Sequence, residues 1–167
     1  LALAEKYLSE GAQVYGFSRR LCPLSHKNLH AVQAALLDTP NIPGIMFELL
    51  IGQKKLDLVV LNAGILGDIA YMKDVPLYDL KKTMDINLWG NKIVLDWLFK
   101  HVEDVSQVIA ISSGAAVNGS KGWNGYSISK AALNMMVALY AVEKPDTHFT
   151  SFAPGLVDTA MQEYLCS

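Results

Sequence analysis

The sequence predicts an α/β fold in which a single domain is built around one doubly wound, mostly parallel sheet. Segments with helical spacing alternate with short apolar strands, as expected where helices connect parallel strands. The composition, 51% hydrophobic and 18% charged, is typical of a sheet whose two faces are both covered. A length of 167 residues fits one domain, so we treat residues 1–167 as one unit.

Over the first third of the chain, the sequence pattern predicts a helix, a strand and a second helix. Apolar residues recur at helical spacing over residues 1–8. Residues 13–18 (QVYGFS) are typical of a buried strand, whereas the apolar piece over 45–51 fits either state. The second helix is expected to carry four residues at helical spacing: Leu29, Val32, Leu36 and Leu37.

The strongest strand signal is the run over residues 56–61 (LDLVVL), which Asn62 follows directly. Its length and its leucine and valine content are typical of a central parallel strand. Further along the chain we expect helical segments over 77–98 and 126–142, and strands over 108–111 and 148–153.

Polar and small residues directly follow four of the predicted strands. In an open parallel sheet the carboxyl ends of the strands share one edge, and ligands bind beyond that edge. We therefore expect a ligand site built from these positions: Ser18 and Arg19; Asn62, Ala63 and Gly64; Ser112 and Ser113; Pro154 and Gly155.

Tyr126 and Lys130 stand four residues apart in a predicted helix and so share one of its faces. An ammonium beside a phenol favours the phenolate and lowers the phenol pKa from its reference of about 10. Such a tyrosine can transfer a proton near neutral pH. The same pair is also common on solvated helix surfaces, so other residues must decide between the two interpretations.

Two further residues point to chemistry at this place. Ser113 follows a buried strand and precedes Tyr126 through a loop, where its hydroxyl could polarise a carbonyl; a helix cap or turn is the alternative. Asn87 interrupts a helical pattern, although asparagine is a poor helix former. It needs a local reason such as holding a water or a backbone group, and a simple kink is the alternative.

In order and spacing, these residues resemble the NAG motif and the Asn-Ser-Tyr-Lys tetrad of the short-chain dehydrogenases/reductases. The matching positions are Asn62, Ala63 and Gly64, then Asn87, Ser113, Tyr126 and Lys130, and finally Pro154 and Gly155 before Thr159. Within the family, residues 121–123 (KGW) and 154–162 (PGLVDTAMQ) are similar to sepiapterin reductase and bacterial benzil reductase. The resemblance implies a Rossmann-like fold.

The resemblance also implies an activity: an NADPH-dependent carbonyl reductase that transfers hydride to a ketone, with a 1,2-diketone expected. Tyr126 would protonate the oxygen that Ser113 orients. Lys130 would tune Tyr126 and hold the ribose, and Asn87 would anchor a proton-relay water. Trp123 and Asp158 would join Ser113 and Tyr126 as substrate contacts, with packing and a helix cap as alternatives.

The implied cofactor is NADP(H). Arg19 ends the second strand of the family pattern and follows Ser18, where an acidic residue would instead bind the ribose hydroxyls of NAD. A solvated basic turn formed with Arg20 is the alternative. The full set of implied cofactor contacts is Ser18, Arg19, Asn62, Ala63, Gly64, Tyr126, Lys130, Pro154, Gly155, Val157 and Thr159.

Composition argues against several other classes of protein. A net charge of −2 without a basic stripe gives no electrostatic footprint for nucleic acid. The longest apolar helical run, 131–142, is shorter than the roughly 20 residues of a membrane span. The four histidines lack metal-site spacing, so we expect no metal, with His26 and His30 at a solvated helix end. Two cysteines outside any CxxC pair or disulfide framework suggest the cytoplasm.

The pattern departs from the family at both ends and once inside the chain. The family's first strand and its glycine-rich phosphate loop are not recognisable, nor are its last helix and strand, so we expect part of the domain only. The stretch between Arg20 and Leu56 is short for a helix, a strand and another helix.

Two other classes of protein fit the same residues, and a homodimer is expected. A catalytically inactive nucleotide-binding sensor or protein-interaction module of the same fold is a second reading of the site, and a flavodoxin-like binding domain is a third. Helices over 77–98 and 126–142 carry more apolar residues than one sheet face needs, and in relatives such helices pair across a dimer, so a homodimer acting on a small carbonyl substrate is expected.

Overall fold

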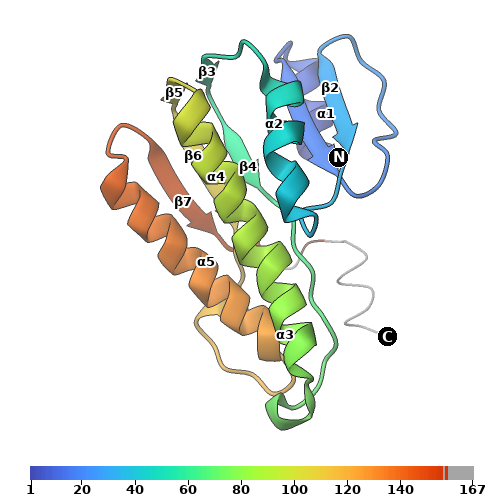
Figure 1. Ribbon diagram of the computed structural model, residues 1–167, viewed down its shortest axis with the longest axis vertical. Coiled ribbons are helices and arrows are strands. Elements are labelled where there is room, and N and C mark those ends of the chain that lie inside the picture. The colour runs from blue at the N-terminus through green and yellow to red at the C-terminus, as the bar shows by residue number, and fades with distance from the viewer. Residues whose placement is uncertain (156, 158–167) are drawn as a thin grey trace.

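The computed structural model describes residues 1–155 and 157, and all its paired strands are parallel (Figure 1). The central unit is a three-stranded sheet in the order β4-β6-β7, accompanied by the pairs β1-β2 and β3-β5. The strands are β1 (Val14–Ser18), β2 (Leu29–Gln33), β3 (Lys55–Leu56), β4 (Val59–Leu61), β5 (Asp104–Val105), β6 (Gln107–Ile111) and β7 (His148–Phe152). The predicted parallel α/β class is confirmed.

Helices form a layer across one face of these strands. In Figure 1, α2, α4 and α5 run side by side in front of the strands, and α2 contacts α4 while α5 contacts β6 and β7. Helix α1 packs against β1. The α-helices of the described residues are α1 (Ala2–Ser9), α2 (Ile42–Leu50), α3 (Leu77–Met84), α4 (Gly90–His101) and α5 (Asn124–Glu143).

The hydrophobic core lies between this helical layer and the sheet. Leu95 of α4, Val108 of β6 and Leu133 of α5 are fully buried and belong to one continuous cluster. Each buried aliphatic side chain of this size stabilises the fold by about 1.5–3 kcal/mol relative to exposure. The core therefore fixes α4 and α5 against the strands whose ends carry the candidate site.

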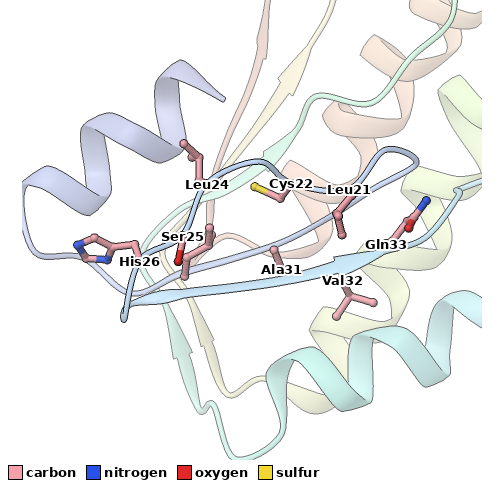
Figure 2. A pocket seen from close by; sticks show the side chains of 9 residues that line it. Leu21, Cys22, Leu24, Ser25, His26, Ala31, Val32 and Gln33 are labelled. Carbon is pink, nitrogen blue, oxygen red and sulfur yellow. The ribbon is translucent and has the colours of Figure 1, made fainter.

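The prediction of a helix through Leu29 and Val32 was wrong, because residues 29–33 form strand β2. This strand pairs with β1 from Val14–Leu29 to Ser18–Gln33. Helix α2 packs on it, and the loop over 19–28 lies along its other side (Figure 2). Leu29 and Val32 are the half-buried residues of this strand, and they lie on opposite faces, while the other three residues are exposed. Their spacing of three residues also fits one face of a helix, so the apolar pattern did not distinguish the two states.

The two histidines that were assigned to a helix end lie elsewhere. His26 is in the loop before β2, where its Nδ1 accepts a hydrogen bond from the Asn28 backbone. His30 is within β2, and its ring stacks on Tyr15 at 4.8 Å between centroids. The stretch from Arg20 to Leu56 thus holds β2 and α2 but no helix between β1 and β2.

Two predicted elements are interrupted. The strand expected over 56–61 is divided into β3, which pairs with β5, and β4, which pairs with β6. The long helical segment contains a π-helical turn, Asp85–Trp89, between α3 and α4, in which the Gly90 amide donates to the Asp85 carbonyl. Such turns are frequent at functional sites. This one places Asn87 in the interior, with none of its surface exposed.

In the part of the chain that the structure describes, every helix is too short or too polar to cross a bilayer.

Candidate active site

The four groups of residues predicted to build a ligand site follow strands that run in the same direction. Strands β1, β4, β6 and β7 end at Ser18, Leu61, Ile111 and Phe152, and Figure 1 shows the arrowheads of β2, β4 and β7 pointing toward one end of the molecule. The segments that continue from β4 and β6 pass beyond this end. The edge of the sheet predicted from the sequence is therefore present in the fold.

Tyr126 and Lys130 lie one turn apart near the start of α5, and both are buried. The Lys130 Nζ is 5.7 Å from the centroid of the Tyr126 ring. The Trp123 ring lies beside the same phenol, at 5.7 Å between centroids. The structure thus brings the pair together in the interior, which argues against a solvated surface pair.

Lys130 is held by the end of β6. Its Nζ donates a hydrogen bond of 2.6 Å to the Ile111 carbonyl, and the side chain has 3% of its surface exposed. Burial disfavours the ammonium form and lowers the pKa of Lys130 to about 8 from an ordinary value of 10.5. The charge of this lysine therefore responds to pH close to neutrality.

The Asn87 carboxamide joins three segments of the chain. Its Oδ1 accepts from the Ile65 amide at 2.8 Å, and its Nδ2 donates to the Ile65 carbonyl at 2.9 Å. The same Nδ2 donates to Ser129 Oγ at 2.9 Å, and Ser129 Oγ donates to the Tyr126 carbonyl at 2.8 Å. Asn87 thereby connects the segment after β4 to the turn of α5 that carries Tyr126.

Asn91 supports Asn87 from the next helical turn. Its Nδ2 donates to the Asn87 carbonyl at 2.9 Å, and it is almost fully buried. Neither Asn91 nor Ser129 was among the predicted site residues. The signal for Asn91 was a second asparagine four residues after the first in an apolar helix, and Ser129 lies inside the quoted Tyr126–Lys130 motif.

The two serines after β6 have different surroundings. Ser112 is buried and donates to Asn134 Oδ1 at 2.6 Å, while its amide donates to the Phe152 carbonyl. Ser113 is half-buried, and its Oγ accepts from the Ala115 amide at 3.2 Å. An oxygen that accepts in this way keeps its own hydrogen for donation to a ligand. Ser112 thus ties strand to helix, and Ser113 has the available hydroxyl.

The space around Gly64 bears on whether a flat cofactor group could lie at this edge of the sheet. A Cβ atom at this position would lie 3.4 Å from both Asn87 Oδ1 and Lys130 Nζ. Glycine thus keeps open the space next to the lysine, and Asn62 and Ala63 before it are exposed. Pro154, Gly155 and Val157 are also exposed at the end of β7. These residues fit the nicotinamide and ribose side of a dinucleotide.

The predicted contacts at the other end of the cofactor are less enclosed. Ser18 Oγ donates to the Arg20 carbonyl, and Gln33 donates to the Arg19 carbonyl, so the turn after β1 has a defined backbone. The side chain of Arg19 is exposed. Asp158 and Thr159 lie outside the described residues.

A pocket of about 240 Å³ lies beyond this turn, between the loop over 19–28 and β2 (Figure 2). Cys22, Ser25 and His26 line it from the loop, and Ala31 and Gln33 line it from the strand. It is separate from the tetrad, since no residue of the tetrad lines it. Within 1–155 and 157, no three histidine, cysteine or acidic side chains cluster as metal ligands would, and the absence of a metal stays a prediction.

Comparison with known proteins assigns this arrangement to a family. A family model described as short chain dehydrogenase matches residues 1–167, and the chain belongs to that family. Benzil reductase of Bacillus subtilis is 30% identical over 178 residues, covering 99% of this chain and 73% of the relative. Bovine sepiapterin reductase is 32% identical, covering 81% and 49%. The resemblance stated from the motifs is confirmed.

Two further relatives define the fold and the extent of the match. The crystal structure of the Saccharomyces cerevisiae short-chain dehydrogenase/reductase YIR035C superposes with a TM-score of 0.87 at 25% identity, covering 98% of this chain and 68% of that one. An uncharacterized oxidoreductase of Schizosaccharomyces pombe is 38% identical over 109 residues, covering 65% and 44%. The chain thus spans about half the length of some curated relatives that it matches.

The pKa of Lys130 gives a test that does not depend on activity. In protein labelled with ¹³C at lysine Cε, we expect one lysine to titrate with a midpoint near pH 8 and to disappear in Lys130→Arg. The folded-state pKa lies below the unfolded value of 10.5, so the unfolded state binds more protons between these limits. This group therefore makes folding more favourable as pH rises from about 8 to 10.5. Midpoints near or above the ordinary lysine value for every lysine would contradict this assignment.

Proposed function

We propose that the protein is an NADPH-dependent carbonyl reductase that reduces a ketone, with an aromatic 1,2-diketone as the preferred substrate class. The observation that carries the proposal is the buried pair of Tyr126 and Lys130. Lys130 binds the Ile111 carbonyl, two residues before Ser113, whose hydroxyl hydrogen is available to a ligand. A proton donor, a nearby cation and a hydrogen-bond donor are what carbonyl reduction requires of the protein.

In the proposed mechanism, Ser113 donates a hydrogen bond to the carbonyl oxygen and fixes its position. Tyr126 then gives its phenolic proton to this oxygen. Lys130 stabilises the phenolate that forms, because its ammonium lies next to the Tyr126 ring. Asn87 holds the segment after β4 and the Tyr126 turn in register, and in the family it anchors a water of the proton relay.

Residues at the strand ends would hold the cofactor. Asn62, Ala63 and Gly64 would meet its nicotinamide half together with Lys130, and Pro154, Gly155 and Val157 would approach from the segment after β7. Thr159 is proposed as a further contact. When bound there, NADPH supplies the hydride for the carbonyl carbon. Ser18 and Arg19 would take the adenosine half, where the exposed Arg19 guanidinium suits a 2′-phosphate.

The substrate class follows from the neighbourhood of Tyr126 and from the relatives. Trp123 presents an aromatic wall next to the phenol, which suits a flat aromatic group. The relatives named benzil reductase and sepiapterin reductase match most of this chain at about 30% identity. Asp158 is proposed as a further substrate contact, and a cytoplasmic location stays a prediction.

The outer face of α5 supports the proposed homodimer. Ile128, Met135, Leu139 and Val142 fall at intervals of seven, four and three residues and so form one stripe along the helix. All four are exposed, from 46% for Ile128 to 83% for Val142. A second copy of the chain would remove this apolar stripe from water.

The central test compares the full-length protein with its Tyr126→Phe variant. With benzil and NADPH, we expect turnover, and we expect kcat to fall by about 10²–10⁴-fold in Tyr126→Phe because the proton donor is lost. The loss of NADPH absorbance measures the rate. Tyr78→Phe, at an exposed position of α3, is the control and should retain activity. NADPH binding without turnover of any carbonyl would instead favour the nucleotide-binding sensor.

Cofactor choice is tested at the turn after β1. We expect Arg19→Ala to raise KM for NADPH by about 10- to 100-fold, because charge-assisted hydrogen bonds to the 2′-phosphate are lost. The KM for NADH should change little. Arg20→Ala is the matched control, with both constants close to wild type. Equal effects of Arg19→Ala on the two cofactors would refute a phosphate contact.

Oligomeric state is tested on the α5 stripe. We expect the full-length protein to elute as a dimer, and Met135→Lys to shift it to a monomer because a charge would be buried between the copies. Light scattering coupled to gel filtration gives the mass. Met72→Lys, at an exposed methionine outside α5, should leave the dimer intact. A wild-type monomer at micromolar concentration would be evidence against this interface.

A further inference from the structure

Asn124, the first residue of α5, makes contacts that the tetrad does not explain. Its Nδ2 lies 2.9 Å from the Asp68 carbonyl, 3.0 Å from the Ala70 carbonyl and 3.0 Å from the Gly122 carbonyl. A carboxamide nitrogen carries two hydrogens, so the three acceptors share them. One side chain thus collects three backbone oxygens from two segments that are more than fifty residues apart.

The two segments also contact each other directly. The Ala70 amide donates to the Gly122 carbonyl at 3.3 Å, and Ala70 and Trp123 form an isolated parallel bridge. The first segment follows β4, and the second leads into α5. Figure 1 shows these connections meeting beyond the carboxyl ends of the strands, next to the start of α5.

Close packing at Gly122 shows that this approach is specific. Gly122 has a φ of +85°, and a Cβ atom there would lie 2.7 Å from Ile69 Cγ2. A larger residue would be strained in the backbone and would push Ile69 away. The contact that Asn124 closes therefore depends on the backbone shape of both segments.

This contact borders the proposed substrate position. Trp123, the partner of Ala70, has its ring 5.7 Å from the Tyr126 ring. Ile69 is adjacent to Gly122 and is 47% exposed. Ile69 and Trp123 are thus the apolar residues at this contact, here called the wall, and the hydrogen bonds of Asn124 hold their two segments together.

We propose that Asn124 is a positioning residue that clamps the segment 68–70 to the start of α5 and so sets the wall that receives the apolar part of the carbonyl substrate. The inference rests on the proposed function. Asn124 acts on substrate binding, whereas proton transfer stays with Tyr126. The donors are essential to the clamp, because an aspartate of the same shape would face three carbonyl oxygens with an acceptor.

The test compares Asn124→Asp with Asn118→Asp in the full-length protein, since Asn118 is exposed, makes no side-chain hydrogen bond with the described residues and takes the same added charge. For Asn124→Asp we expect KM for benzil to rise about 10-fold or more, with kcat within about threefold and the Kd for NADPH within about twofold of wild type. Hydrogen exchange of the peptide that contains Ala70 should become faster, because the hydrogen bond from the Ala70 amide to the Gly122 carbonyl opens. Asn118→Asp should change none of these quantities. Asn124→Ala serves as the second variant if Asn124→Asp does not fold.

Each other outcome overturns the proposed role of Asn124 in substrate binding. Faster exchange with an unchanged KM would make Asn124 a purely structural residue, and a lower kcat at constant KM would place its effect on the chemistry. Unchanged exchange would show that Asn124 does not hold the two segments. If the wild-type protein turns over no carbonyl, the proposed function fails by itself, and the exchange measurement alone then decides the clamp.

Discussion

The buried carboxamide of Asn87 is the interaction on which the candidate site depends. It forms hydrogen bonds with the amide and the carbonyl of Ile65, which follows β4, and with the Ser129 hydroxyl of α5. It therefore satisfies polar groups of both segments. Leaving a buried polar group of this kind without a partner costs about 1–3 kcal/mol. The Tyr126 turn and the edge that follows β4 therefore hold one relative position, and Lys130 and Gly64 meet in the space between them.

The helix α5 concentrates several tasks at its first turns. Asn124 binds carbonyl groups of two connecting segments, and Lys130 lies beside Tyr126 and binds the end of β6. Ser129 accepts a hydrogen bond from Asn87. The fully buried Leu133 anchors the same helix in the core one turn further on. Geometry at the site is thus set by a rigid element, and the loops around it are attached to that element by side-chain hydrogen bonds.

Much of this arrangement could be predicted, because strand ends and motif residues carry local signals. The alternation of elements, the strands ending at Ser18 and Ile111, and the helix that carries Tyr126 all appear in the structure. Strand β2 was missed because its two half-buried apolar residues, Leu29 and Val32, lie three positions apart, a spacing that resembles a helix. Asn124 was missed for a different reason: its partners are backbone carbonyls, which leave no residue-specific pattern in a sequence. The partner of Asn91 is also a backbone carbonyl, so the spacing of four residues from Asn87 was its signal.

The π-helical turn at Asp85–Trp89 makes chain length a determinant of the site. A regular α-helical turn closes i→i−4 hydrogen bonds, whereas the turn at Asp85–Trp89 closes an i→i−5 bond and so holds one residue more. Removing a single residue there would restore regular winding and take away the wide turn on which Asn87 lies. The Asn87 carboxamide would then leave Ile65, although every residue with a proposed chemical role would still be encoded. Insertions and deletions in this helix are therefore constrained as strictly as the identities of the residues that line the site.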